Sequence, residues 1–299
     1  MTQFKMMPTA VALLLLALSS SGAQSGEPAV REVLKTGNQH IVGVAEPASG
    51  RFIVYADEHE LKIYNRQTRK VTPVAVRVTE AWGGSLSISR SGGRIVFPVS
   101  TEDPKHKPYI WSLDLDTLTG APLGAPHRVT VTQALMAAIS PDGRWIAFSA
   151  IDCECYGSGL GTRLLVMPSA GGDERMLDSA GRMQTPRWTP DGKSIFYVRG
   201  QGQGPSLRRI ALGGGAHDSL ESAQGVIGVS DDGKYVAFLA TRSDENGVVK
   251  IADLQGRTIA TVPFNGQQDR PLAWASGHDR ERASNDARAV AARGDRSHG

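Results

Sequence analysis

The sequence predicts an all-β fold, a β-propeller with five complete four-stranded blades and an incomplete sixth. A ten-residue pattern recurs along the chain at intervals of 41 to 51 residues. Each copy places an Asp-Gly or Ser-Gly turn between two apolar segments, and each repeat has room for two more short strands. Regular repeats of about 40 to 50 residues, each with four strands, are typical of propeller blades.

The first residues have the composition of an export signal. Lys5 precedes an apolar run over residues 10–18, and the small residues Ser21, Gly22 and Ala23 follow. The run is too short to span a bilayer, and the small residues suit cleavage after Ala23. We expect residues 1–23 to be a signal peptide and the mature protein to be periplasmic or secreted, without a membrane span.

The repeated pattern is a β-hairpin. Its clearest copy is Ile-Ser-Pro-Asp-Gly-Arg-Trp-Ile-Ala-Phe at residues 139–148, and it recurs at 188–197 and 229–238, with weaker copies at 44–55 and 88–97. An apolar strand leads into a turn that needs a positive φ at glycine, and a β-branched or aromatic strand leaves it. The turn glycines are Gly50, Gly92, Gly143, Gly192 and Gly233.

Two further strands follow each hairpin. In the third repeat, residues 164–167 and 175–177 flank an Ala-Gly-Gly-Asp turn, and in the first repeat residues 61–64 and 71–78 take the same places. One or two such hairpins occur in any β-sandwich. Five at near-regular spacing indicate blades.

The Ser-Pro-Asp-Gly form, without Gly-His or Trp-Asp signatures, resembles the six-bladed TolB-like family with its WD40-like PD40 repeats. The resemblance covers roughly residues 30–275. It implies a propeller domain over residues 24–275 that docks protein partners in the cell envelope. TolB has an additional N-terminal α/β domain for which this chain has no counterpart, so we expect a stand-alone scaffold.

The sixth repeat departs from the family pattern. It begins at residues 271–274, but Ala-Ser-Gly-His-Asp-Arg follows where Ser-Pro-Asp-Gly belongs. Residues 276–299 are rich in Ala, Arg, Asp and Ser, and we expect a disordered polar tail. Residues 30–34 are placed to supply an outer strand of the last blade. Either the chain is a truncated or frame-altered six-bladed propeller, or it is a five-bladed ring with a tail.

The two cysteines, Cys153 and Cys155, are close in the sequence. At this spacing an extended chain places them near the upper limit for a disulfide. Two thiols alone leave a tetrahedral metal site half empty. A strained disulfide, free thiols, and a metal or redox role remain alternatives.

Polar residues recur where the chain enters each inner strand. In a propeller these entries lie on the face opposite the Asp-Gly turns, around the central channel, where ligands usually bind. We expect a polar channel mouth there, although the same residues would also suit a solvated funnel. The predicted binding residues are His40, Trp82, Gln133, Arg182, Gln184, Gln224 and Gln268.

The loops on this face are charged and mixed in sign. They cover residues 57–60, 102–107, 152–163 and 244–246. Such loops suit a protein partner recognised by complementary charge, and ordinary solvation also explains them. The formal net charge is +3, with no basic stripe, so we expect no nucleic-acid binding.

The chain shows no convincing catalytic motif. A prolyl-oligopeptidase-like hydrolase needs a Gly-x-Ser-x-Gly elbow, and the segment at residues 83–87 lacks the last glycine. Lactonase-like propellers hold calcium with acidic groups, whereas the predicted mouth is mostly glutamine with Arg182. We therefore expect an exported binding scaffold with no metal, cofactor or catalytic residue. The alternative is the propeller portion of one of these two hydrolase types. The oligomeric state stays open.

Overall fold

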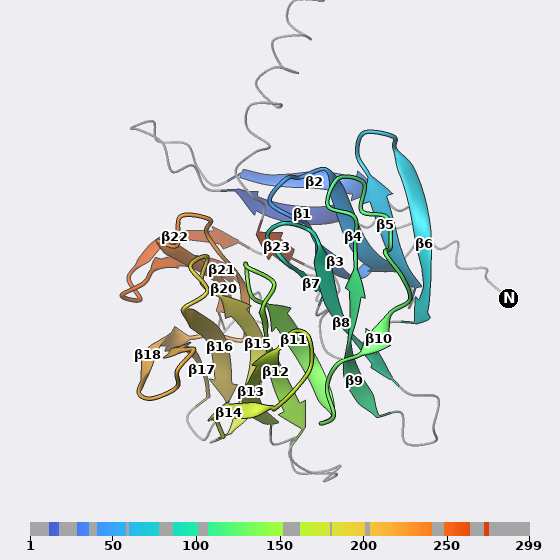
Figure 1. The fold of residues 1–299 in the computed structure, drawn as a ribbon. Helices are drawn as coiled ribbons and strands as arrows, with labels where there is room; N and C mark the ends of the chain where they lie inside the picture. Colours follow the sequence, from blue (N-terminus) through green and yellow to red (C-terminus); the bar gives the residue numbers. More distant parts are fainter. Residues whose placement is uncertain are drawn as a thin grey trace, which may run out of the picture.

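Five four-stranded sheets and one three-stranded sheet surround a central axis (Figure 1). This computed structural model describes residues 12–17, 29–35, 41–57, 60–77, 86–100, 107–151, 162–179, 181–200, 204–240, 248–263 and 272–274. The prediction of an all-β propeller with five complete blades is confirmed. Within these ranges, no helix is long and apolar enough to span a membrane.

Each complete blade is an antiparallel meander that begins with its innermost strand. Blade one holds β3 (Ile41–Ala45), β4 (Phe52–Asp57), β5 (Glu60–Asn65) and β6 (Lys70–Arg77). Blade two holds β7 (Ser87–Ile88), β8 (Arg94–Ser100), β9 (Pro108–Asp114) and β10 (His127–Arg128). Blade three holds β11 (Ala134–Ile139), β12 (Trp145–Ile151), β13 (Thr162–Pro168) and β14 (Arg175–Asp178). Blade four holds β15 (Arg182–Trp188), β16 (Ser194–Gly200), β17 (Pro205–Ala211) and β18 (His217–Ser222). Blade five holds β19 (Gly225–Val229), β20 (Tyr235–Ala240), β21 (Val248–Asp253) and β22 (Thr258–Pro263).

The sixth sheet joins the two ends of the described chain. It consists of β2 (Ala29–Lys35), β1 (Ala12–Ala17) and β23 (Leu272–Trp274), in that order. β1 is antiparallel to β2 but parallel to β23, unlike any pairing in the five complete blades. As expected, residues 30–34 lie in an edge strand of this sheet. β1 falls within the predicted signal peptide, whose cleavage stays a prediction, and the predicted tail at 276–299 lies outside the described residues.

The inner strands form a closed ring. Each inner strand contacts the next one along the chain, in the order β3, β7, β11, β15, β19 and β23. β23 in turn contacts β3. Figure 1 shows the sheets radiating from this ring. The ring therefore closes through β23, the first strand of the interrupted sixth repeat.

The hairpin turns have the conformation that the sequence predicts. The five turn glycines have φ values of 60, 83, 75, 69 and 70°. In blade three, the Ser140 hydroxyl donates to Asp142 Oδ1 at 2.5 Å and accepts from the Trp145 N–H at 2.9 Å. Thr189 and Ser230 make the equivalent contacts in blades four and five. The recurring Ser/Thr and Asp side chains thus stabilise the turns of blades three, four and five from within.

The core lies between successive blades. On β16, Ile195 and Tyr197 pack against blade three, whereas the alternating residues Phe196 and Val198 pack against blade five. All four are at most 1% exposed. Because both faces of each blade are covered, the second strands are apolar over most of their length and do not alternate with polar residues.

Candidate functional site

The two faces of the propeller are built from different segments. On what we call the turn face, the turns after the first and third strands meet: the Ser169 N–H donates to Arg144 O at 2.8 Å in blade three. On the opposite loop face, the inner strands begin next to the ends of the second strands. There the Ile151 N–H donates to Gln133 O at 2.8 Å, and the Gln224 N–H donates to Leu239 O at 2.7 Å.

Four of the seven predicted binding residues lie in the described part of the chain, all on the loop face. Gln133 and Gln224 directly precede β11 and β19, and Arg182 and Gln184 lie in β15. Only Arg182 and Gln184 are brought together in one pocket. His40, Trp82 and Gln268 lie outside the described residues, as do Cys153 and Cys155.

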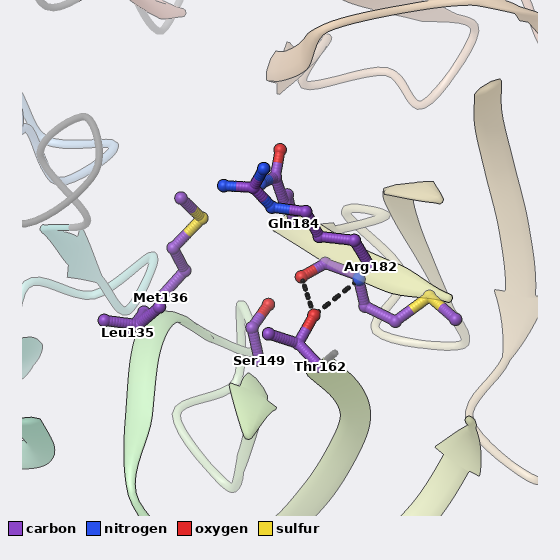
Figure 2. Close-up of a pocket in the computed structure, with 7 residues that line it drawn as sticks. Leu135, Met136, Ser149, Thr162, Arg182 and Gln184 are labelled. Carbon is purple, nitrogen blue, oxygen red and sulfur yellow. Dashed lines mark hydrogen bonds between the residues drawn. The ribbon is translucent and has the colours of Figure 1, made fainter. Parts of the chain in front are cut away.

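A small pocket lies between blades three and four (Figure 2). Its free volume is about 10 Å³, which is roughly the space for one water molecule. Its lining residues come from two inner strands and from the strands behind β11: Leu135, Met136, Ser149, Thr162, Arg182, Met183 and Gln184. A guanidinium and an amide thus face an apolar wall.

Arg182 and Gln184 act as one polar unit. They lie two residues apart on β15, so their side chains leave the same side of the strand. With its amide oxygen turned toward Arg182, Gln184 accepts hydrogen bonds from Nε at 2.5 Å and from Nη2 at 3.1 Å. The amide therefore fixes the orientation of the guanidinium beside the pocket.

Two hydroxyl groups in the pocket differ in their bonding. Thr162 Oγ1 donates to Met183 O at 2.7 Å and accepts from the Met183 N–H at 2.5 Å (Figure 2). Ser149 is 1% exposed, and its Oγ has no hydrogen-bond partner in the described structure. Buried polar groups are normally satisfied, so a water molecule in this small space is the partner that the Ser149 hydroxyl can take.

Sequence reasoning missed the residues that the third blade contributes. Met136 and Ser149 lie in strands that read only as core, and Thr162, predicted to lie in the loop at residues 152–163, begins β13 instead. Ser149 interrupts the apolar run Ile-Ala-Phe-Ser-Ala of β12, and this single polar residue was the available signal. Its position beside Arg182 follows from the packing of blade three on blade four.

A bulge in β15 connects the site to both neighbouring blades. The pairing of β15 with β16 shifts between Gln184 and Arg187, and Thr185 within the shift has a φ of 48°. The Thr185 N–H donates to Met136 Sδ at 3.2 Å, and its Oγ1 accepts from the Val226 N–H at 2.9 Å. Thr185 therefore bridges β11 and β19 across the inner ring.

The described residues form no metal centre. Over the ranges that the structure covers, no group of three His, Cys, Asp or Glu side chains could hold a metal ion. Separately, the lining of the pocket offers the hydrogen-bonding groups of Arg182 and Gln184 next to the apolar side chains of Leu135 and Met136.

The fold agrees with solved propeller structures. One is a protein described as TolB from Agrobacterium tumefaciens, with a TM-score of 0.64 and 19% identity over 83% of this chain and 90% of that chain. The chain has the fold of a TolB propeller. TolB from Acinetobacter baumannii matches with a TM-score of 0.63 and 19% identity over 86% of this chain, which spans 63% of that longer protein.

Other propellers match at lower identity. A structure of a nidogen/laminin complex matches with a TM-score of 0.61 and 14% identity, over 89% of this chain and 95% of that one. A gluconolactonase from Xanthomonas campestris matches with a TM-score of 0.51 and 14% identity, over 76% and 77% of the two chains. No protein-family model and no curated protein matches the sequence. The TolB-like fold is thus established with five complete blades, while six-bladed PD40 membership stays an expectation.

Proposed function

We propose that this chain is an exported, non-catalytic binding propeller whose loop face docks a protein partner of the cell envelope. The observation that carries the proposal is the pocket between blades three and four. Arg182 and Gln184 lie there beside Leu135 and Met136. A few fixed polar groups beside apolar side chains are typical of recognition sites.

The structural likeness to TolB supports a binding role over a catalytic one. The similar TolB chains share the fold at 19% identity. Another similar structure is, by its description, part of a protein complex between nidogen and laminin. Neither identity is high enough to transfer a partner, so the partner must be found by experiment.

Site-specific photo-crosslinking in the producing cell tests the docking face. A photoreactive phenylalanine analogue at Gln133 reports on the loop face, and the same analogue at Lys193, in a blade-four hairpin turn, reports on the turn face. We expect a discrete protein adduct from position 133 and a much weaker one from 193. Equal adducts from both positions, or none from 133, would contradict loop-face docking.

Calcium-dependent hydrolysis is the second candidate because a gluconolactonase shares the fold. Such a site needs carboxylates that converge on the channel. The described inner strands contain none: their charged residues are Arg182 and Arg187. Calorimetry with calcium chloride distinguishes the two functions. We expect no binding tighter than millimolar, and micromolar binding would favour the hydrolase.

A further inference from the structure

The sixth sheet differs from the five complete blades in the origin of its central strand. In each complete blade the inner strand pairs with the strand that follows it in the sequence, whereas β23 is the last strand of the described chain. The place beside β23 is taken by β1, from the opposite end of the described chain (Figure 1). The sixth sheet is therefore completed by a segment from outside the repeats.

Backbone pairing holds β1 on both sides. Residues 14–16 pair in parallel with residues 272–274 of β23 and antiparallel with residues 30–32 of β2. β2 is the outer strand of this sheet, and β1 is its one neighbour there. Adjacent strands lie about 4.8 Å apart, so the axes of β2 and β23 are about 10 Å apart and one strand fits between them.

The sequence of β1 shows which kind of strand this position accepts. It is Ala-Leu-Leu-Leu-Leu-Ala, without a charged residue or a proline. Apolar side chains of both neighbouring blades lie outside the interfaces with blades two and four. They are Ile53 of blade one and a cluster of Ile227, Ala237, Val249 and Ile251 in blade five, all at most 8% exposed. An apolar strand suits this position because it keeps such side chains away from water.

β1 also lies within the predicted signal peptide. Cleavage after Ala23 would disconnect β1 from β2 and allow it to leave the sheet. The edges of β2 and β23 that faced β1 would then carry unpaired N–H and C=O groups. Paired edges of this kind are a template for a strand from another chain.

We propose that processing opens the central position of the sixth sheet to an extended apolar strand of a partner protein. The incoming strand runs parallel to β23 and antiparallel to β2, as β1 does, and covers the six residues that β1 covers. This inference rests on the export included in the proposed function. Its binding surface is the interior of the sixth sheet, which is separate from the pocket between blades three and four.

The test uses the full chain with a site for a sequence-specific protease inserted after Ala23, before and after the cut. The probe is a fluorescent peptide, Ala-Leu-Leu-Leu-Leu-Ala with lysines at both ends for solubility. The control peptide has proline in place of the third leucine, so it stays apolar but cannot pair fully on both sides.

Fluorescence anisotropy measures binding with the peptide in excess over the chain. We expect the cut chain to bind the leucine peptide at least tenfold more tightly than the uncut chain, because tethered β1 competes at a high local concentration. The cut chain should bind the proline peptide at least tenfold more weakly than the leucine peptide.

Hydrogen exchange shows where the peptide binds. Binding should slow the exchange of amides in residues 29–35, because β2 regains its strand neighbour, and in residues 272–274 of β23. Amides of β16 in blade four, residues 194–200, are the control and should not change.

Several results would overturn the proposal. Equal binding to the cut and uncut chains would show that no position has opened. Equal binding of both peptides, or binding without slower exchange in β2, would indicate nonspecific apolar adhesion. If the cut chain unfolds once β1 leaves, the leucine peptide must restore its thermal transition, and failure to do so contradicts strand addition. Exported protein that retains residues 12–17 by mass spectrometry would also contradict it, because its own strand would fill the position.

The two proposals can fail separately. A loop-face adduct at Gln133 without peptide uptake by the cut chain would support docking and exclude strand addition. Peptide uptake without an adduct at Gln133 would support strand addition and exclude loop-face docking.

Discussion

At the scale of single residues, Thr185 carries an uncommon combination of strain and bonding. Its φ of 48° is unfavourable for a β-branched side chain, yet its hydroxyl accepts the Val226 N–H at 2.9 Å and thereby joins blades four and five. This hydrogen bond offsets the strain of the positive φ, and removing the hydroxyl should leave the strained backbone without the bond.

We expect Thr185→Val to lower the free energy of unfolding by about 1–3 kcal/mol, because the Val226 N–H loses its acceptor while the strained backbone stays. Thr185→Gly loses the same bond but relieves the strain, so its effect should be smaller. Urea denaturation of the three proteins measures both values. A Gly variant less stable than the Val variant would show that the positive φ is not strained.

Asp191 shows how the turn motif responds to pH. Asp191 Oδ1 accepts hydrogen bonds from the Thr189 hydroxyl at 2.6 Å and from the Lys193 N–H at 3.0 Å. These bonds lower the pKa of Asp191 below its ordinary value. A carboxyl group with a depressed folded-state pKa stabilises the protein above its unfolded pKa. That contribution is lost as pH falls through the folded pKa.

The stability difference between wild type and Asp191→Asn should therefore be largest near neutral pH and should shrink below about pH 4. Denaturation curves of the two proteins from pH 7 to pH 2.5 measure it. A difference that does not change over this range would mean that the charge of Asp191 does not stabilise the turn.

At the scale of elements, the hairpin turns explain why the fold is readable from the sequence. A turn glycine with positive φ recurs at each hairpin and marks the end of an inner strand, and in blades three to five Ser or Thr and Asp precede it. This signal is local, so five blades can be counted without knowing how they pack. The β15 bulge has no such signal, because Thr-Pro within a strand also suits an ordinary edge.

Gly143→Ala should lower the free energy of unfolding by about 1 kcal/mol, because its φ of 75° is unfavourable for alanine. The space around Gly143 is open enough for the added Cβ, whose nearest neighbour would be Ser89 Cβ at 3.5 Å. Gly213→Ala is the matched control, since Gly213 has no positive φ and no neighbour within 4 Å. Equal thermal stabilities of the two variants would contradict this account of the turns.

At the scale of the whole molecule, closure of the ring depends on the sixth sheet. Phe52 and Val54 of β4 pack against blade two, so Ile53 between them faces the other side of the blade, toward the sixth sheet. In blade five, Ile251 belongs to a cluster that lies outside the interface with blade four. Both side chains are fully buried. The sixth sheet therefore covers apolar faces of blades one and five.

The sequence predicted a sixth blade that is interrupted after residue 274, but it did not predict β1 as the central strand of the sixth sheet. Long-range pairing of β1 with β23 joins residues far apart in the chain, and its parallel register has no counterpart in the other repeats. The candidate site shows the same limit. Arg182 and Gln184 were predicted from their positions where the chain enters an inner strand, whereas Met136 and Ser149 depend on how two blades pack.

Signal-peptide cleavage after Ala23 would remove β1 and separate β2 from β23. We expect the exported protein to begin at Gln24 by mass spectrometry and to unfold at a lower temperature than the uncleaved chain, because its sixth sheet has lost its central strand. Thermal unfolding of residues 24–299 beside the full chain measures this. Equal melting temperatures would show that β1 does not contribute to closure.

The affinity of the crosslinked partner for purified variants tests the central claim most directly. Once the partner that reacts at Gln133 has been isolated, its dissociation constant is measured for wild type, Arg182→Gln and the turn-face control Lys234→Gln. Loop-face docking predicts about tenfold or greater weakening for Arg182→Gln and no change for Lys234→Gln, because a fixed guanidinium beside an apolar wall is a typical binding hot spot. Unchanged affinity for Arg182→Gln, or equal weakening in both variants, would contradict it.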